Sequence, residues 1–165
     1  IPEYAKARFF IRATTRERLN AVTKKVKAVA EGAALATGAT LEVIAFQNEV
    51  DNLLFNRTFD EIFREEATAL GEDVKTDERP GLGSTDAGNI SQVLPTIHPY
   101  IKIGVDDLVA HTESFREAAK SEQGDEALIT GAKILARAGL RLLTDDSLLG
   151  TVKQEFHDRK NGYLT

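Results

Sequence analysis

The first fifty residues alternate between strand-like and helix-like hydrophobic patterns. In residues 4–13 (YAKARFFIRA), apolar side chains fall on every second position, which predicts a half-buried strand. Thr14 and Glu17 then form a capping-box pattern, apolar residues come after them at helical spacing, and Gly38 is a plausible helix stop. A second strand is predicted over about 40–47, where β-branched and aromatic residues are common.

Helical spacing dominates the rest of the chain. A helix is predicted over 58–71, with Thr58 and Glu61 as its capping box and Gly71 as its stop. Three more are predicted towards the end: one over 113–121 capped by Thr112, one after Asp125, and one after Asp145 or Asp146, with a fraying tail beyond Phe156. Between these groups lie a polar linker candidate at 72–83 and short strands predicted at 90–94 and 100–105.

A strand, a helix and a strand in about 45 residues indicate an α/β or α+β unit. Such a unit is too small to close a core, so its packing partners are expected upstream or in another subunit. The absence of methionine and the Ile1-Pro2 start suggest a piece of a longer protein.

The amino-acid composition limits which binding partners and which kinds of metal or disulfide site are possible. The 165 residues include 42% hydrophobic and 28% charged positions, typical of a globular domain. A net charge of −5 argues against a nucleic-acid or anionic-membrane surface, and no apolar run is long enough to span a bilayer. Cysteine is absent, which excludes disulfides and thiolate metal sites and fits a cytoplasmic location.

The stretch GLGSTDAGN at 81–89 has the most unusual local composition. A phosphate-binding loop is excluded because the stretch lacks the required lysine and carries Asp86. Two interpretations stay open: a flexible turn in which Asp86 caps the next turn of the chain, or a substrate-facing loop whose glycines let backbone N–H groups approach a carbonyl or carboxylate.

The histidines and the Glu65-Glu66 pair provide few further candidates for metal-binding or catalytic residues. His111 precedes the predicted Thr112 cap and comes after two aspartates, but no H-x-D or H-E-x-x-H motif accompanies it. A complete zinc site is therefore not encoded here. Glu65 and Glu66 are assigned to the solvated side of their helix, because the apolar residues of that helix define the other side.

Three segments together resemble a known family. They are ERPGLGSTDAGNISQVLPTIHPYIKIG, AHTESFREAA and EALITGAKILARAGLRLL, and they succeed one another as in the C-terminal part of the zinc aminoacylase/carboxypeptidase superfamily, nearest its aminobenzoyl-glutamate hydrolase branch. IPEYAKARFFIRATTRERL resembles the second half of the inserted lid domain of that superfamily.

The resemblance implies a fold and an activity. Residues 1–55 would be half of a ferredoxin-like α+β lid that forms a homodimer, and residues 56–165 the remainder of an α/β catalytic domain. Such enzymes use two zinc ions to hydrolyse an amide bond beside a carboxylate-bearing amino acid, as in N-acyl amino acids, aminobenzoyl-glutamate or dipeptides. This chain would carry no catalytic base and would be inactive without the upstream half of the same protein.

By the same resemblance, His111 matches the last metal ligand, and Gly83, Ser84, Thr85 and Asp86 match a loop that lines the substrate cleft. Arg12 lies near the position where the family presents a cation to the substrate carboxylate. Its neighbours Lys6 and Arg8 belong to the same polar face. The main alternative is a non-catalytic ferredoxin-like dimerisation module. A small-ligand regulatory domain is a third interpretation, which no feature of the sequence specifically supports.

Overall fold

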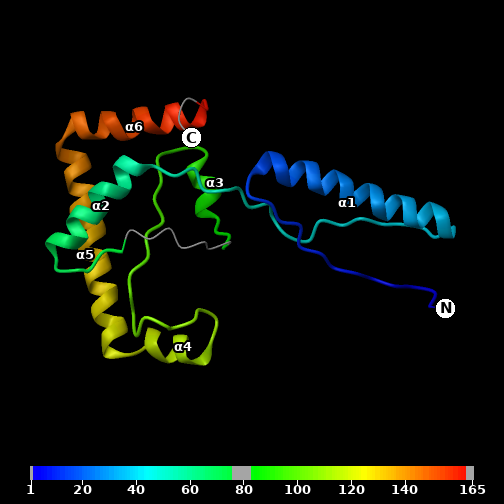
Figure 1. Ribbon diagram of the computed structural model, residues 1–165, viewed down its shortest axis with the longest axis horizontal. Helices are drawn as coiled ribbons and strands as arrows, with labels where there is room; N and C mark the ends of the chain where they lie inside the picture. Colours follow the sequence, from blue (N-terminus) through cyan, green and yellow to red (C-terminus); the bar gives the residue numbers. More distant parts are fainter. Residues whose placement is uncertain (1, 76–82, 163–165) are drawn as a thin grey trace.

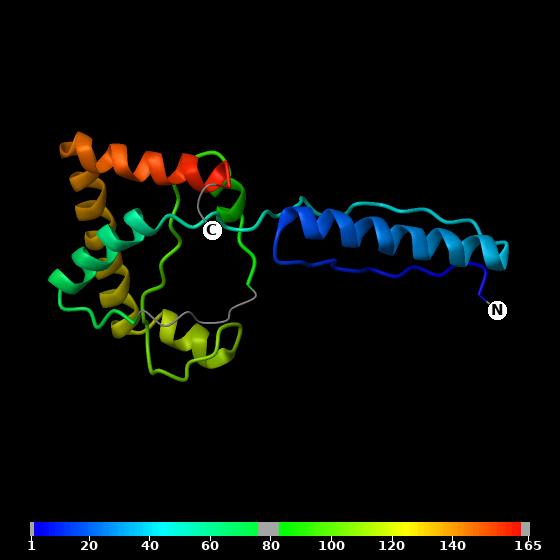
Figure 2. The same cartoon turned by 45° about the horizontal axis from the view of Figure 1, so that its top comes forward.

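A computed structural model describes residues 2–75 and 83–162. Six α-helices occur in this part of the chain: α1 (Arg16–Thr37), α2 (Arg57–Ala69), α3 (Ala87–Ser91), α4 (Glu113–Ala119), α5 (Glu122–Thr144) and α6 (Asp146–Lys160). They form two parts, because α1 projects away from the other five helices in both ribbon views (Figures 1 and 2). We call α1 and its flanking segments, residues 2–50, the arm, and the remaining helices the body. None of the helices in the described ranges is long and apolar enough to cross a membrane.

The arm consists of α1 and two extended segments, residues 2–13 and 39–50, that run beside it (Figures 1 and 2). The helix begins where the Thr15 hydroxyl accepts a hydrogen bond from the Arg18 N–H, one residue later than the cap predicted at Thr14. It ends at Gly38, whose left-handed φ of 70° matches the predicted stop. Across the two extended segments, the rings of Phe10 and Phe46 meet edge to face at 5.4 Å.

The α/β fold class with a ferredoxin-like lid is wrong, because no β-strand occurs among the residues that the structure describes. The segments predicted as strands at 4–13, 40–47 and 100–105 are extended, but no backbone hydrogen bond joins them to another described segment. Alternating hydrophobicity indicates an extended segment with one apolar and one polar face. A β-strand also requires a second segment with which its backbone can form hydrogen bonds. The strand predicted at 90–94 is wrong as well, since Ile90 and Ser91 belong to α3.

The body is built around α2, α5 and α6, which pack against one another. Ile62 from α2, Ala138 from α5 and Val152 from α6 are buried together and form its centre. Phe59, Leu142 and Leu148 pack around them. Ile62, Ala138 and Val152 were among the apolar positions that predicted these helices, whereas Leu128 and Leu135, which also predicted α5, are exposed.

Caps set the helix boundaries of the body. Thr112 and Asp145 cap α4 and α6 as predicted, through hydrogen bonds from the Phe115 and Leu148 N–H groups. The start predicted for α5 at Asp125 is late, because the Ser121 hydroxyl accepts the Gly124 N–H at 3.1 Å. The predicted fraying beyond Phe156 is wrong for residues 157–160, which belong to α6, and residues 163–165 lie outside the described part of the chain.

The N-terminus of α2 is held by α6 rather than by the capping box predicted at Thr58. The Asn56 side chain accepts the Phe59 N–H at 2.9 Å and donates to the Val152 carbonyl at 2.9 Å. The Glu155 carboxylate accepts the N–H groups of Arg57 and Thr58, both at 2.8 Å, and the Arg159 guanidinium at 2.8 Å. A carboxylate from α6 therefore satisfies two of the donors that a helix start leaves unpaired.

Glu155 should make stability depend on acid pH. Burial alone would raise the pKa of this carboxyl, but hydrogen bonds from Thr58, Arg159 and the Arg57 N–H outweigh it and lower the pKa from 4.5 to about 2. A depressed folded pKa stabilises the fold above the unfolded value, and this contribution disappears as the pH falls from 4.5 through 2. We expect Glu155→Gln to remove about 1–2 kcal/mol at neutral pH after solvent screening is allowed for, and to flatten stability across that window.

Urea unfolding of the two proteins at a series of pH values measures this effect. Glu126→Gln, on an exposed position of α5, is the matched control and should behave like the unsubstituted chain. Parallel pH curves for Glu155→Gln and the unsubstituted chain would contradict the expectation.

Candidate functional site

Two residues assigned separately to substrate binding meet at the base of the arm. The Arg12 Nη2 atom donates to the Ser84 hydroxyl at 3.4 Å, across 72 residues of sequence. Arg12 comes from the extended segment before α1, and Ser84 from the loop before α3. The fold therefore brings the predicted cation and the predicted glycine-rich loop to one surface.

The Arg16 guanidinium fixes the start of α1 to the segment that returns from the arm. It pairs with the Asp51 carboxylate and, at 2.9 Å, with Glu49. The Arg16 N–H also donates to the Asn52 side chain at 3.1 Å. These contacts hold Arg12, four residues before Arg16, close to the body.

Asn89 and Gly88 of α3 also contact the segment that returns from the arm; together with Arg16 and Asp51 they form what we call the joint between the arm and the body. The Asn89 side chain accepts the Asp51 N–H at 3.0 Å and donates to the Glu49 carbonyl at 3.1 Å. A Cβ on Gly88 would lie 2.0 Å from the Asp51 carbonyl oxygen, so only glycine allows this approach. Both residues belong to the GLGSTDAGN stretch, but the sequence analysis assigned no role to either. A glycine next to an asparagine was the one feature of the sequence that could have indicated this close contact.

Asp86 occupies the N-cap position of α3, but Thr85 supplies the side-chain hydrogen bond at the start of this helix. The Thr85 hydroxyl accepts the Ala87 N–H at 3.3 Å and donates to the Asp86 carboxylate at 3.4 Å. Asp86 makes no side-chain capping bond, so the interpretation of this residue as a turn cap is not what the structure has. Gly83, Ser84 and Asp86 are exposed, whereas Gly81 and Leu82, and most of the predicted linker at 72–83, fall outside the described residues. The exposed carboxylate of Asp86 thus lies two residues after the serine that contacts Arg12.

His111 lies elsewhere in the body. It is exposed, directly precedes the Thr112 cap of α4, and has a positive φ of 66°, a conformation that non-glycine residues adopt infrequently. Both ribbon views separate α4 from α3, so the structure does not bring His111 to the Arg12–Ser84 contact (Figures 1 and 2).

The described residues do not by themselves fit a zinc site. Within residues 2–75 and 83–162, no group of three or more His, Cys, Asp and Glu side chains is placed to hold a metal ion. Protein zinc sites take three or four such ligands. His111 could supply one imidazole, and the other ligands would have to come from residues that the structure does not describe or from another polypeptide.

Glu66 is not on the solvated side of its helix, contrary to the sequence prediction. It is buried, and its carboxylate pairs with Arg137 at 2.5 Å and Arg141 at 3.1 Å. The hydrogen bond from Arg137, together with Arg141, lowers the pKa of Glu66. The pair of glutamates therefore ties α2 to α5, with Glu65 reaching Arg141 at 2.8 Å.

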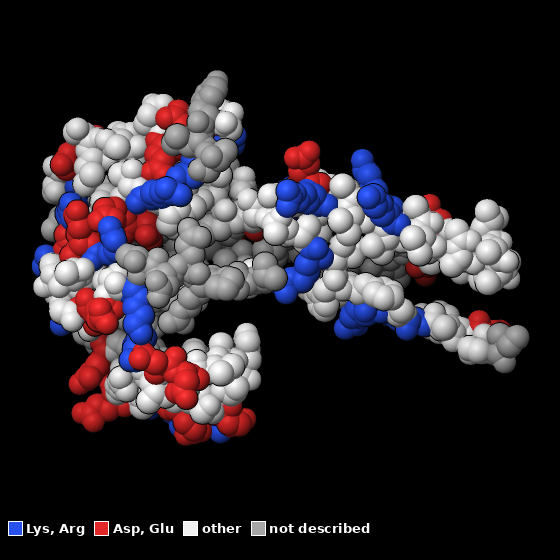
Figure 3. All heavy atoms as spheres, in the orientation of Figure 1, with Lys and Arg blue, Asp and Glu red and all other residues white. Residues whose placement is uncertain are grey.

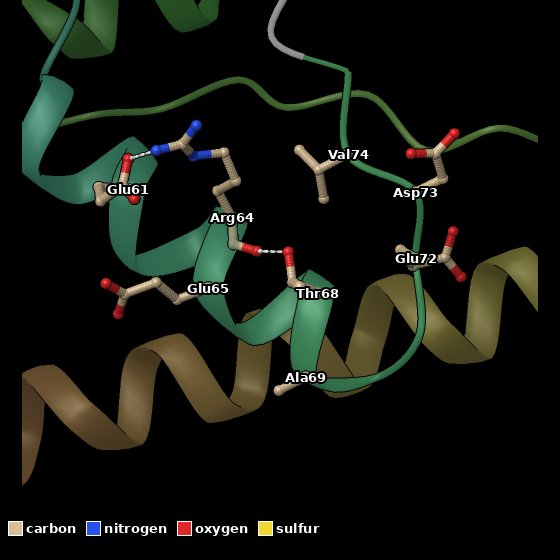
Figure 4. A pocket seen from close by; sticks show the side chains of 8 residues that line it. All are labelled: Glu61, Arg64, Glu65, Thr68, Ala69, Glu72, Asp73 and Val74. Atoms are coloured by element: carbon tan, nitrogen blue, oxygen red, sulfur yellow. Dashed lines mark hydrogen bonds and ion pairs between the residues drawn. The ribbon is translucent and has the colours of Figure 1, made fainter.

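A surface hollow beside α2 carries no separate chemistry. It is lined by Glu61, Arg64, Glu65, Thr68, Ala69, Glu72, Asp73 and Val74 (Figure 4). In the close-up, Arg64 pairs with Glu61, and the Thr68 hydroxyl donates to the Arg64 carbonyl. Glu65 pairs instead with Arg141 of α5, and Glu72 and Asp73 project from the segment after α2, so the charged groups of the hollow do not converge on a common point.

We compared the chain with protein-family models and with proteins of known function. No protein-family model matches the chain. A Xaa-Arg dipeptidase of Mus musculus is 35% identical over 159 residues, and a Xaa-Arg dipeptidase of Homo sapiens is 33% identical over the same length. The chain is similar to part of a dipeptidase. Each match covers 94% of this chain but only 37% and 36% of the relatives, so the chain spans little more than a third of their length.

The similarity supports the general prediction of a hydrolase that acts on peptide or amide bonds. It covers nearly the whole chain, including the arm, the glycine-rich loop and the helices of the body. The branch within the superfamily and the position of the match within the relatives stay predictions.

Proposed function

We propose that this chain forms part of a dipeptide hydrolase whose substrates end in arginine. The observation that carries the proposal is the Arg12–Ser84 contact, which joins two predicted substrate residues in a chain similar to Xaa-Arg dipeptidases. The activity belongs to a larger assembly, since the chain spans little more than a third of those relatives.

Arg12 is suited to bind the C-terminal carboxylate of a dipeptide. A guanidinium presents two parallel N–H groups that match the two oxygens of a carboxylate. The Ser84 hydroxyl, already within 3.4 Å of the Arg12 Nη2 atom, can donate to the same group. Residues 1–55 carry eight Lys or Arg and six Asp or Glu, so the arm is positive although the whole chain has a net charge of −5. Figure 3 shows Lys and Arg side chains spread along the arm.

Asp86 is suited to bind the arginine side chain of the same substrate. Its carboxylate is exposed, caps no helix and lies two residues from Ser84. A carboxylate pairs with a guanidinium through two hydrogen bonds, which gives geometric selectivity as well as attraction. One substrate residue would thus meet Arg12 with its carboxylate and Asp86 with its side chain.

Zinc remains a proposal for the larger assembly. Two ions would activate water and polarise the scissile carbonyl, with most ligands in the part of the relatives that this chain does not match. His111 lies apart from the Arg12–Ser84 contact, so it would be a ligand only where that part brings a metal ion between them. The homodimer through residues 1–55 likewise stays a prediction.

The metal proposal is tested in a chimaera that joins this chain to the part of the mouse dipeptidase that it does not match. We expect the chimaera to bind zinc and to hydrolyse a Xaa-Arg dipeptide, and His111→Ala to lower zinc content and to reduce the rate by about 100-fold or more. His157→Ala, an exposed histidine of α6, is the control. Unchanged zinc content in His111→Ala would remove His111 from the metal site, and no hydrolysis in the unsubstituted, folded chimaera would refute the function.

A further inference from the structure

Helix α5 is apolar on two opposite sides, and only one of them is covered. Ala127, Ile134 and Ala138 are buried on the inner side, where α5 packs against α2 and α6. The other side carries five large apolar residues that are mostly exposed: Leu128 (68%), Ile129 (55%), Leu135 (57%), Leu140 (60%) and Leu143 (82%). We call these five residues the outer stripe.

The outer stripe is continuous along the helix. Leu128, Leu135 and Leu143 align through Ala132 and Gly139 at steps of three or four residues, and Ile129, Ala136 and Leu140 form the adjacent row. The charged residues Glu126, Lys133 and Arg137 lie along one edge of it, and Asp125 lies within it, one turn before Ile129. The two rows make the stripe broader than the single seam of a two-stranded coiled coil.

A helix with apolar residues on both sides is typical of the interior of a larger domain, where layers cover it on each side. In the described part of the chain, α5 contacts α2 and α6, as well as α4 near its start and the Ile101 side chain beside Gly131, while the residues of the outer stripe stay 55–82% exposed. The small residues Ala132 and Gly139 along the stripe would let a broad surface approach the helix closely.

The dipeptidase relatives indicate what the second layer is. They match this chain along 94% of its length, α5 included, and their remaining length is larger than the matched part. We propose that the outer stripe is the docking surface for the polypeptide equivalent to that unmatched remainder. A second copy of this chain fits less well, because two identical broad stripes would meet as a helix pair and leave one row of each exposed. The inference rests on the same similarity as the proposed function but needs no catalysis.

Cysteine labelling tests the proposal, since the chain has no cysteine of its own. Leu135→Cys places a thiol on the outer stripe, and Glu126→Cys places one on the exposed polar edge of the same helix. Each variant is labelled with a maleimide, alone and joined to the unmatched part of the mouse dipeptidase, and the labelled peptides are quantified by mass spectrometry. We expect joining to slow labelling of Leu135→Cys by about tenfold or more and to leave Glu126→Cys unchanged.

Three results would overturn the proposal: equal labelling of both variants in the joined protein, a joined protein that does not fold, or protection of Leu135→Cys that appears in the isolated chain as its concentration rises. The last result would assign the surface to a second copy. A folded, protected chimaera without hydrolase activity would refute the proposed function and leave this interface intact.

Discussion

Replacing Arg12 with glutamine, in the chimaera of this chain and the unmatched part of the mouse dipeptidase, is expected to lower kcat/KM for a Xaa-Arg dipeptide by roughly 30- to 100-fold. This corresponds to a loss of about 2–3 kcal/mol of transition-state stabilisation. The loss should lie mainly in KM, because Arg12 is proposed to hold a carboxylate that does not react. Arg12→Lys should recover only part of the activity, since an ammonium cannot present two parallel N–H groups. Steady-state kinetics on the three proteins measure both quantities.

Arg8→Gln is the control for this prediction. Arg8 lies on the same segment, and its guanidinium lies over the Phe46 ring, 4.8 Å from the ring centroid. Its replacement removes one positive charge but not the proposed contact. Equal losses in Arg8→Gln and Arg12→Gln would reduce the role of Arg12 to general attraction of anions.

The largest effect on stability is expected from Asn56→Ala. Asn56 is 1% exposed, and its side chain both caps α2 and bonds to the Val152 carbonyl of α6. Alanine would leave the part-buried Phe59 N–H without its cap and would remove the buried bond from the Asn56 side chain to the Val152 carbonyl, at a cost of about 2–3 kcal/mol in the free energy of unfolding. Urea unfolding followed by circular dichroism measures this loss.

Asn20→Ala provides the comparison, because Asn20 is exposed on α1 and alanine favours a helix. This variant should be neutral or slightly stabilised. A loss below about 1 kcal/mol in Asn56→Ala would show that water replaces the lost partners and that the link between α2 and α6 contributes little.

The helices could be predicted from the sequence because their signals are local. Thr112, Asp145 and Gly38 act within one turn of their own helix, so their pattern survives in the structure. The predicted strands were wrong because alternation in residues 4–13 describes one segment, whereas a strand requires a second segment with which to pair. Caps supplied from a distance were missed for the same reason: Glu155 lies 97 residues from Thr58.

The geometry of the candidate site could not be predicted from the sequence. The resemblance named Arg12 and Ser84 separately, and their hydrogen bond is a product of the fold. The joint formed by Arg16, Asp51 and Asn89 carries no local signature, because each residue is an ordinary polar residue within its own segment. Glu66 shows the converse error, since arginines on another helix allow an acid to be buried on a side that its own helix marks as polar.

Release of free arginine from a Xaa-Arg dipeptide tests most directly whether this chain is one part of a dipeptide hydrolase. The assay compares the isolated chain, the unmatched part of the mouse dipeptidase, and the two joined in one polypeptide. We predict that only the joined protein releases arginine, and that it does so faster than it cleaves a dipeptide ending in alanine. A folded joined protein that releases no arginine, or an unmatched part that is equally active alone, would contradict this role.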